Sequence, residues 1–262
     1  MDPLIYNTNT FLEIRNNYNI KDTELDSLFN TIFNIKKKKN YFNQNFSIAE
    51  KKKNELVSYL NKITPNNYIH MFNMMYEICN THSLTPFLIE NIFILSTTQS
   101  IYCTYYVKII KQFLENTTHK EDIMKYIIKK ITEFKNISFK NNIKDNSGLS
   151  YDEFCENNKL KLFKKGYSQF LGELYLNNII EYKIVIENIN SIISNLKTII
   201  KSDNKEFIED SILCIEKLCS TIVNKMNVYD KKKIRTDFEN IELNPNISKR
   251  LKFKIMDLKE RL

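Results

Sequence analysis

The stretch FKKGYSQFLGELYLNNII, residues 163–180, decides the fold that we predict for this chain. It holds Gly166 and Gly172, two of the three glycines in 262 residues. Its apolar residues recur at helical spacing, so both glycines are expected within or beside a helix: Phe163, Phe170, Leu171, Leu174 and Tyr175. A glycine inside a helix costs about 1 kcal/mol relative to alanine and commonly marks the close approach of another backbone. The stretch therefore predicts a tight crossing between helices.

The composition favours a fold made of helices. Of all residues, 42% are apolar, 12% aromatic and 27% charged, which is typical of globular proteins, and the chain is long enough to bury a substantial core. Only three glycines and four prolines are present, whereas sandwiches, barrels and doubly wound sheets need turn residues at every connection. The predicted fold class is all-α.

Helical patterns follow one another along the chain with short breaks. Thr64-Pro65 and Thr85-Pro86 each supply an N-cap and a first-turn proline for a new helix. Other helices are predicted over residues 22–36, 47–62, 102–114, 120–136, 157–177, 179–200, 205–226, 230–241 and 247–262. Helices of about 12 to 20 residues, paired across short turns, indicate a HEAT-type α-solenoid of about five antiparallel helical hairpins.

The chain divides into two predicted regions. Residues 1–46 form an N-terminal extension with one helix, and residues 47–262 form the helical domain. Within that domain the polar, glycine-containing segment FKNNIKDNSGLS, residues 139–150, predicts an internal loop.

No catalytic or metal-binding pattern is recognisable. The five cysteines include no CxxC pair, the three histidines are scattered, and no glycine-rich phosphate loop follows a strand. Glu173, in the opening stretch, is expected to pair with a neighbouring cation or cap a turn rather than act as an acid or base. We expect a binding protein that is not an enzyme and that uses no metal or cofactor.

The expected compartment is the cytoplasm. An odd number of cysteines without a CxxC pair fits reduced thiols, the N-terminus MDPLIYNTN lacks a basic segment followed by an apolar one, and no run of 18 apolar residues occurs. We therefore expect neither export nor a membrane span. The abundance of Lys, Asn and Ile suggests an AT-rich genome.

Positive charge is concentrated in two parts of the chain, which has a net charge of +8. Residues 36–53 carry seven lysines and one glutamate, a net +6, and a second group lies between residues 231 and 254. Such clusters can neutralise RNA phosphates, and a solvated helix face is the alternative. The candidate RNA-binding residues are Lys51, Lys52, Lys53, Lys231, Lys232, Lys233, Lys249 and Arg250.

Three short motifs, in order, resemble the middle domain of eukaryotic translation initiation factor 4G. They are LNKITP at residues 60–65, FLGELY at 170–175 and SKRLKF at 248–253. The family has LNKLTP, an FIGELF-like segment and an SSRIRF-like helix at the corresponding places. The resemblance covers residues 47–262, and it departs from the family at Val223, where a glycine is usual.

This resemblance implies a scaffold that binds a DEAD-box RNA helicase, initiation factor 4A, and mRNA. Such scaffolds stimulate the helicase by shifting its open–closed population. Leu60, Ile63 and Tyr68 match the family's helicase-associated apolar positions. Core packing is an equal alternative for Leu60 and Ile63, whereas Tyr68 is the stronger candidate for contact. Gly166, Gly172 and Glu173 are then structural, and the last two are expected to set the curvature of the solenoid.

The N-terminal residues Tyr6, Phe11 and Leu12 resemble the YxxxxLΦ peptide with which longer scaffolds of this kind bind cap-binding factor 4E, with Phe11 in place of leucine. An accidental match is the alternative. So compact a version suggests a large DNA virus, acting in the host cytoplasm, or a reduced eukaryote. Two further interpretations remain: a middle-domain adaptor in mRNA surveillance or splicing-linked complexes, and a general α-solenoid adaptor.

Overall fold

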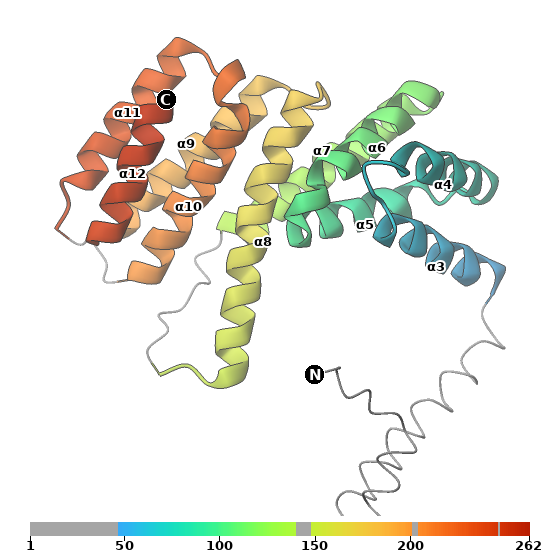
Figure 1. Cartoon of the computed structure of the whole chain (residues 1–262), viewed down its shortest axis with the longest axis horizontal. Coiled ribbons are helices and arrows are strands. Elements are labelled where there is room, and N and C mark those ends of the chain that lie inside the picture. The colour runs from blue at the N-terminus through green and yellow to red at the C-terminus, as the bar shows by residue number, and fades with distance from the viewer. Residues whose placement is uncertain (1–46, 140–147, 201–203, 246) are drawn as a thin grey trace, which may run out of the picture. The chain divides into compact units, whose positions relative to one another are not determined.

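The computed structural model describes residues 47–139, 148–200, 204–245 and 247–262, with the backbone alone at 136–139. All regular elements in these ranges are helical, which confirms the all-α fold class (Figure 1). The α-helices are α3 (Ile48–Asn61), α4 (Tyr68–His82), α5 (Thr85–Thr98), α6 (Cys103–Asn116), α7 (Lys120–Phe139), α8 (Tyr151–Leu176), α9 (Tyr182–Ile199), α10 (Lys205–Ile222), α11 (Val228–Glu242) and α12 (Lys249–Arg261). Two 3-10 helices, η1 (Ser100–Tyr102) and η2 (Val223–Lys225), precede α6 and follow α10.

Most helices begin and end within a few residues of the predicted bounds, but α8 begins earlier than residue 157. A capping box starts it: the Ser150 side chain accepts a hydrogen bond from the Glu153 amide (3.3 Å), and the Glu153 carboxylate accepts one from the Ser150 amide (3.1 Å). Such caps contribute about 1 kcal/mol. The prediction was wrong because it followed apolar spacing and missed the S-x-x-E signal.

The predicted cap at Thr64-Pro65 is also wrong. Helix α4 begins at Tyr68, and Pro65 lies in the preceding turn. The Thr64 amide donates to the Asn67 side chain (2.7 Å), whose own amide group donates to the Lys62 carbonyl (2.9 Å). These two bonds hold residues 62–67 as a turn. At Thr85-Pro86 the proline does lie in the first turn of α5, but Thr85 is the first helical residue and Leu84 holds the N-cap position, so the predicted Thr85 cap is wrong.

The helices pack in a regular order. Each of α4, α6, α8, α10 and α12 contacts the next in that series, and α5, α7, α9 and α11 pack against the helices that follow them. Helix α8 lies between the helices α3–α7 and the helices α9–α12, and it contacts both α5 and α10 extensively (Figure 1). Its position makes α8 the main link between the two halves.

The glycines of α8 lie where two other helices come close to it. A Cβ atom on Gly166 would come within 1.9 Å of the Thr97 carbonyl oxygen of α5. A Cβ atom on Gly172 would come within 2.7 Å of the Thr221 side chain of α10. The tight crossings predicted from residues 163–180 are therefore confirmed, and they join α8 to two different helices.

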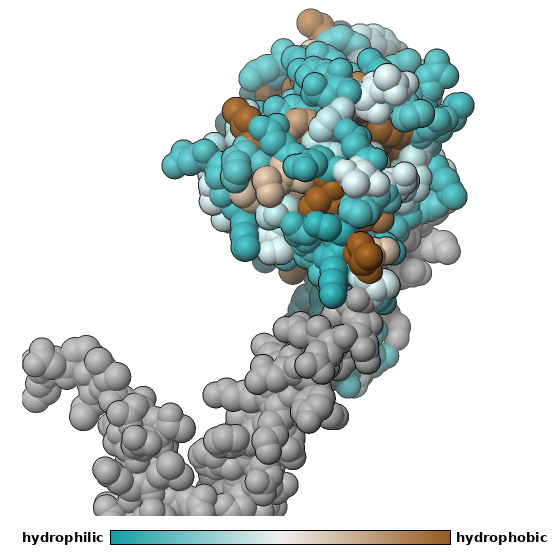
Figure 2. Space-filling model, turned by 90° about the vertical axis from the view of Figure 1, so that its right-hand side faces the viewer, coloured by the Kyte–Doolittle hydropathy of each residue, from teal (hydrophilic) through white to brown (hydrophobic). Residues whose placement is uncertain are grey.

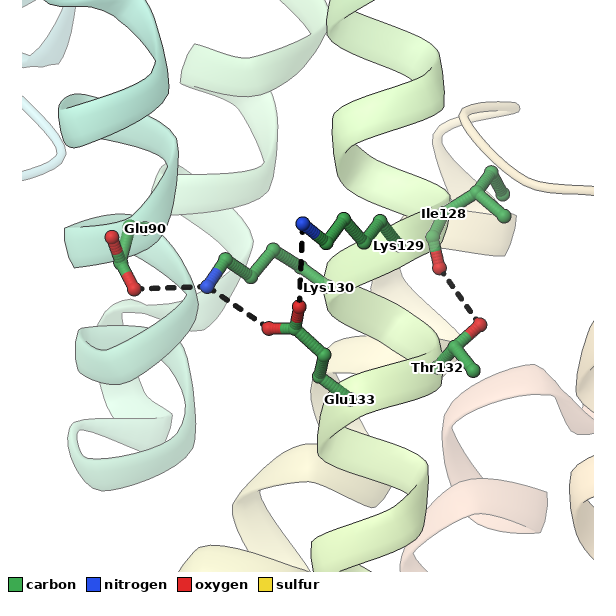
Figure 3. A network of polar contacts seen from close by, with 6 residues as sticks. All are labelled: Glu90, Ile128, Lys129, Lys130, Thr132 and Glu133. Atoms are coloured by element: carbon green, nitrogen blue, oxygen red, sulfur yellow. Dashed lines mark hydrogen bonds and ion pairs between the residues drawn. The ribbon is translucent and has the colours of Figure 1, made fainter.

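Buried aromatic rings and a surface ion network hold α5 and α7 together. The Phe93 ring contacts Phe134 and Phe170 edge-on, at centroid distances of 5.4 and 4.7 Å. The Lys130 ammonium bridges Glu90 of α5 (2.9 Å) and Glu133 of α7 (3.0 Å) (Figure 3). Hydrogen bonds from Lys130 to both carboxylates raise the pKa of Lys130 well above its ordinary value.

Several predictions fall outside the described residues: the helix at 22–36, the Tyr6–Leu12 peptide and most of the loop at 139–150. Residues 52–262 form one compact unit, and the division from the preceding unit, between residues 51 and 52, falls within α3. Among the described helices, none combines the length and apolar character needed to cross a membrane.

Candidate functional site

The turn that follows α3 brings the LNKITP segment into the core. Leu60 and Ile63 are buried, with exposed fractions of 1% and 3%. Both side chains therefore pack in the core, which is one of the two interpretations left open for them. Neither side chain offers surface to a partner. Because they anchor the turn, and because Asn67 closes it, Tyr68 becomes the first residue of α4 and keeps part of its ring in solvent.

Tyr68 belongs to a small aromatic and cationic surface that joins α4 to α6. Its ring centroid lies 5.8 Å from that of Tyr105. The Lys108 ammonium lies 5.6 Å from the Tyr68 centroid and 5.3 Å from the Tyr105 centroid. We call Tyr68, Tyr105 and Lys108 the Tyr68 surface. Cation–π contacts of this kind contribute about 0.5–1 kcal/mol when exposed, so they hold the two rings in place.

Exposed apolar side chains lie next in sequence to the Tyr68 surface. Ile69 follows Tyr68, and Ile101 and Tyr102 lie about one turn before Tyr105; their exposed fractions are 55%, 84% and 37%. Figure 2, seen from the α3–α4 side, shows a mainly hydrophilic face with small separate groups of hydrophobic residues. A partner that binds this face would contact separate aromatic and aliphatic side chains together with the positive charge of Lys108.

Glu173 connects this region to α8. Its carboxylate accepts a hydrogen bond from the Thr104 hydroxyl at the start of α6, at 2.9 Å. Within the described part of the chain the Glu173 carboxylate neither pairs with a cation nor caps a helix, so a bond to a neutral side chain replaces the expected pairing. Glu173 therefore ties α6 to α8, one residue from the Gly172 contact with α10.

A second group of tyrosines lies where α8 ends. The Tyr175 and Tyr182 ring centroids are 5.4 Å apart, and the Tyr182 hydroxyl donates to the Asp230 carboxylate at 2.8 Å. Burial, followed by the bond to Asp230, raises the pKa of Tyr182. The Lys225 ammonium donates to the Leu176 carbonyl at 3.1 Å. This group joins the ends of α8 and η2 to the starts of α9 and α11.

The candidate RNA-binding residues are distributed over α3, α11 and α12. Several are already engaged: Lys52 pairs with Glu55 (2.8 Å), and Arg250 with Glu209 (3.3 Å). Lys53 lies 5.3 Å from the Phe87 ring centroid, and Lys233 donates to the Asn190 side chain (3.0 Å). Lys51, Lys231, Lys232 and Lys249 have no hydrogen-bond or ion-pair partner of their side chains within the described ranges.

One polar cluster that sequence reasoning missed lies inside the protein. Lys164 of α8 pairs with Asp210 of α10 at 3.3 Å, and their side chains are only 3% and 5% exposed. The Lys164 ammonium also lies 5.0 Å from the Phe207 ring centroid. Burial raises the pKa of Asp210 to about 6, against the opposing effect of Lys164.

A sequence signal for this pair did exist. Lys164 stands on the same helix face as the buried Tyr167 and Leu171, and Asp210 shares a face with the buried Phe207 and Cys214. A charged residue at an apolar position of each of two helices predicts a buried ion pair.

The described residues contain no group of three or more His, Cys, Asp or Glu side chains placed to bind a metal. All five cysteines are free, and burial raises the pKa of Cys79, Cys103 and Cys219 to about 12 and that of Cys214 as well. These four thiols therefore carry little thiolate at neutral pH.

Comparison with known proteins found no matching family model and no matching curated protein.

Proposed function

We propose that this chain is a translation-initiation scaffold without catalytic activity of its own, which binds and stimulates a DEAD-box RNA helicase, initiation factor 4A, and contacts RNA. Within this proposal the described helices form a HEAT-type α-solenoid of five hairpins, each made of two consecutive helices from α3 to α12. The successive packing of α4, α6, α8, α10 and α12 supports that arrangement.

One observation carries the proposal: each family-like motif has a distinct structural task. LNKITP forms the turn that presents Tyr68. FLGELY joins α8 to α6 through Glu173 and to α10 through Gly172. In SKRLKF, Ser248 caps α12 by accepting a hydrogen bond from the Leu251 amide at 3.3 Å. Because all three motifs have structural roles in the same fold, their order and spacing support the resemblance more strongly than a chance match of short sequence motifs would.

The Tyr68 surface is the proposed helicase contact. Tyrosine is enriched among residues that dominate binding energy, because a large rigid ring loses little entropy on contact. Leu60 and Ile63 support this surface from the core and do not touch the helicase. A scaffold that contacts both lobes of the helicase favours its closed state only by binding that state more tightly.

Purified full-length chain and purified helicase test the proposal by pull-down and by ATPase stimulation. Tyr68→Ala combined with Lys108→Glu should weaken binding at least about tenfold. Tyr229→Ala, an exposed tyrosine of α11 at 76%, is the matched control and should bind normally. Failure of the wild-type chain to retain the helicase would refute the proposal, and turnover of ATP by the chain alone would refute its lack of catalytic activity.

The proposed contacts with RNA and with cap-binding factor 4E are tested separately. Affinity for single-stranded RNA should fall steeply with salt, and replacing Lys231, Lys232 and Lys249 by Gln should reduce that slope. A flat salt response would leave these lysines as solubilising residues. Capture of cap-binding factor 4E should be lost in Tyr6→Ala/Leu12→Ala, while helicase binding is kept.

A further inference from the structure

The outward face of α12 carries a stripe that is complementary to itself. Lys249, Phe253, Met256 and Glu260 recur at helical spacing on one side of the helix, and the buried Leu251, Ile255 and Leu258 lie on the other. Phe253 is 66% exposed and Met256 44% exposed. Two large apolar side chains are thus held side by side in solvent, between a cation at one end and an anion at the other.

The charges of α12 divide into two sets. Four are engaged within the fold: Arg250 with Glu209, Lys254 with Glu216, Lys259 with Glu242, and Arg261 with Ser220. The other four, all on or beside the outward stripe, have no partner within the described ranges: Lys249, Lys252, Asp257 and Glu260. Internal packing therefore explains half of the charged residues of this helix and leaves the outward half unexplained.

We infer that this face binds a second copy of the chain, with the two α12 helices antiparallel about a two-fold axis. In a two-fold contact, if one residue faces another, the second faces the first in turn. With the axis midway between Phe253 and Met256, each Phe253 faces the partner's Met256. The same register sets each Lys249 opposite the partner's Glu260. Lys252 and the partner's Asp257 lie at the same level along the helices but on opposite flanks of the contact, because a two-fold axis sets each flank against the same flank of the partner.

An aromatic–thioether contact and an ion pair thus coincide in a single register. The aromatic ring meets a flexible thioether, which makes a favourable contact with aromatic rings. The Lys249–Glu260 ion pair is formed twice, and the end of each stripe that carries Lys249 and Lys252 lies along the end of the partner's stripe that carries Asp257 and Glu260. A parallel arrangement would place Lys249 opposite the partner's Lys249, and a shift of the antiparallel register by one residue would place it opposite Lys259 or Arg261. Lys249, Glu260 and the two exposed apolar side chains then all lie in the contact, with Lys252 and Asp257 at its flanks.

The dimer is weak. Helix α12 is about 20 Å long at 1.5 Å per residue, so the contact belongs to the small class of interfaces. Association should depend on concentration in the micromolar range or above, and should weaken with salt because the ion pairs lie at the surface.

Charge reversal gives the decisive test. Sedimentation equilibrium of the full chain, at concentrations up to about 300 µM, should show a monomer–dimer equilibrium. Lys249→Glu/Lys252→Glu has an all-acidic stripe and Asp257→Lys/Glu260→Lys an all-basic one, so each alone should be monomeric. Their equimolar mixture should associate as heterodimers at least as strongly as the wild type.

The control is Lys120→Glu/Lys159→Glu, which makes the same change in net charge at two exposed positions on α7 and α8 and should dimerise like the wild type. Phe253→Ala should weaken the dimer while its circular dichroism stays unchanged. A wild-type chain that is monomeric throughout, or reversed variants that fail to associate when mixed, would overturn the inference. No helicase enters this experiment, so its outcome is independent of the proposed function.

Discussion

Lys164 and Asp210 form an ion pair in the interior, with the ammonium 3.3 Å from a carboxylate oxygen. The pair crosses the contact between α8 and α10, close to the middle of the described chain. Removing two charges from water costs several kcal/mol per ion, and the pair is tolerated because the partners lie close together. The pair is thus a point at which the fold is sensitive to a single substitution.

Asp210→Leu should lower the free energy of unfolding by about 3–5 kcal/mol, because it leaves the buried Lys164 ammonium with neither a hydrogen-bond acceptor nor a counter-charge. The double change Lys164→Met/Asp210→Leu should restore stability to the wild-type value or above. Urea denaturation followed by circular dichroism measures both. Asp237→Asn, at the more exposed pair with Lys197, is the control and should cost less than about 1 kcal/mol. A double variant as unstable as the single one would contradict this account.

Asp210 should also make stability depend on pH. Its pKa rises from 3.8 to about 6 on folding, mainly because of burial. The folded state therefore holds this proton more tightly than the unfolded state. The contribution of the carboxyl to stability is complete below about pH 4 and is lost as the pH rises through about 6. Carbon-13 NMR of the Asp210 carboxyl should show a midpoint near pH 6, and a midpoint near 4 would refute the prediction.

The two glycines of α8 should differ in their response to alanine. Gly166→Ala places a methyl group against the Thr97 carbonyl, which belongs to a helix backbone and cannot turn away. We expect a loss of at least about 3 kcal/mol. Gly172→Ala meets the Thr221 side chain, which can shift in part, so its cost should be smaller.

Gly148→Ala serves as the reference for the glycines. Gly148 has open space around the Cβ position but a φ of +81°, so alanine should cost about 1 kcal/mol from backbone strain alone. A bulky residue at Gly172 should lower stability and helicase binding together. Lost binding at full stability would mean that Gly172 touches the partner.

Thiol chemistry should distinguish Cys155 from the other cysteines. Cys155 is partly exposed, whereas Cys79, Cys103, Cys214 and Cys219 are buried. A disulfide reagent such as DTNB should label one thiol per chain rapidly under native conditions and all five after denaturation. Cys155→Ser should abolish the rapid phase, and rapid labelling of several thiols would indicate that the helices open readily.

The sequence by itself determined the helical class and most helix positions, because apolar spacing and the scarcity of turn residues are local properties. It also marked Gly166 and Gly172 as places of close approach, because glycine destabilises a helix and commonly occurs in one where another backbone comes near. It missed the capped start of α8 and misplaced the start of α4, where side-chain bonds by Ser150 and Asn67 outweigh the apolar pattern and the proline.

Only the tertiary structure decided which residues share a surface. It paired Gly166 with α5 and Gly172 with α10, and it buried Leu60 and Ile63 while leaving Tyr68 beside Lys108. It also separated the charges of α12 into those that the fold neutralises and those that face outward. Such contacts join residues far apart in the chain. The energies of these contacts depend on distance and burial, and the spacing of residues along one helix specifies neither.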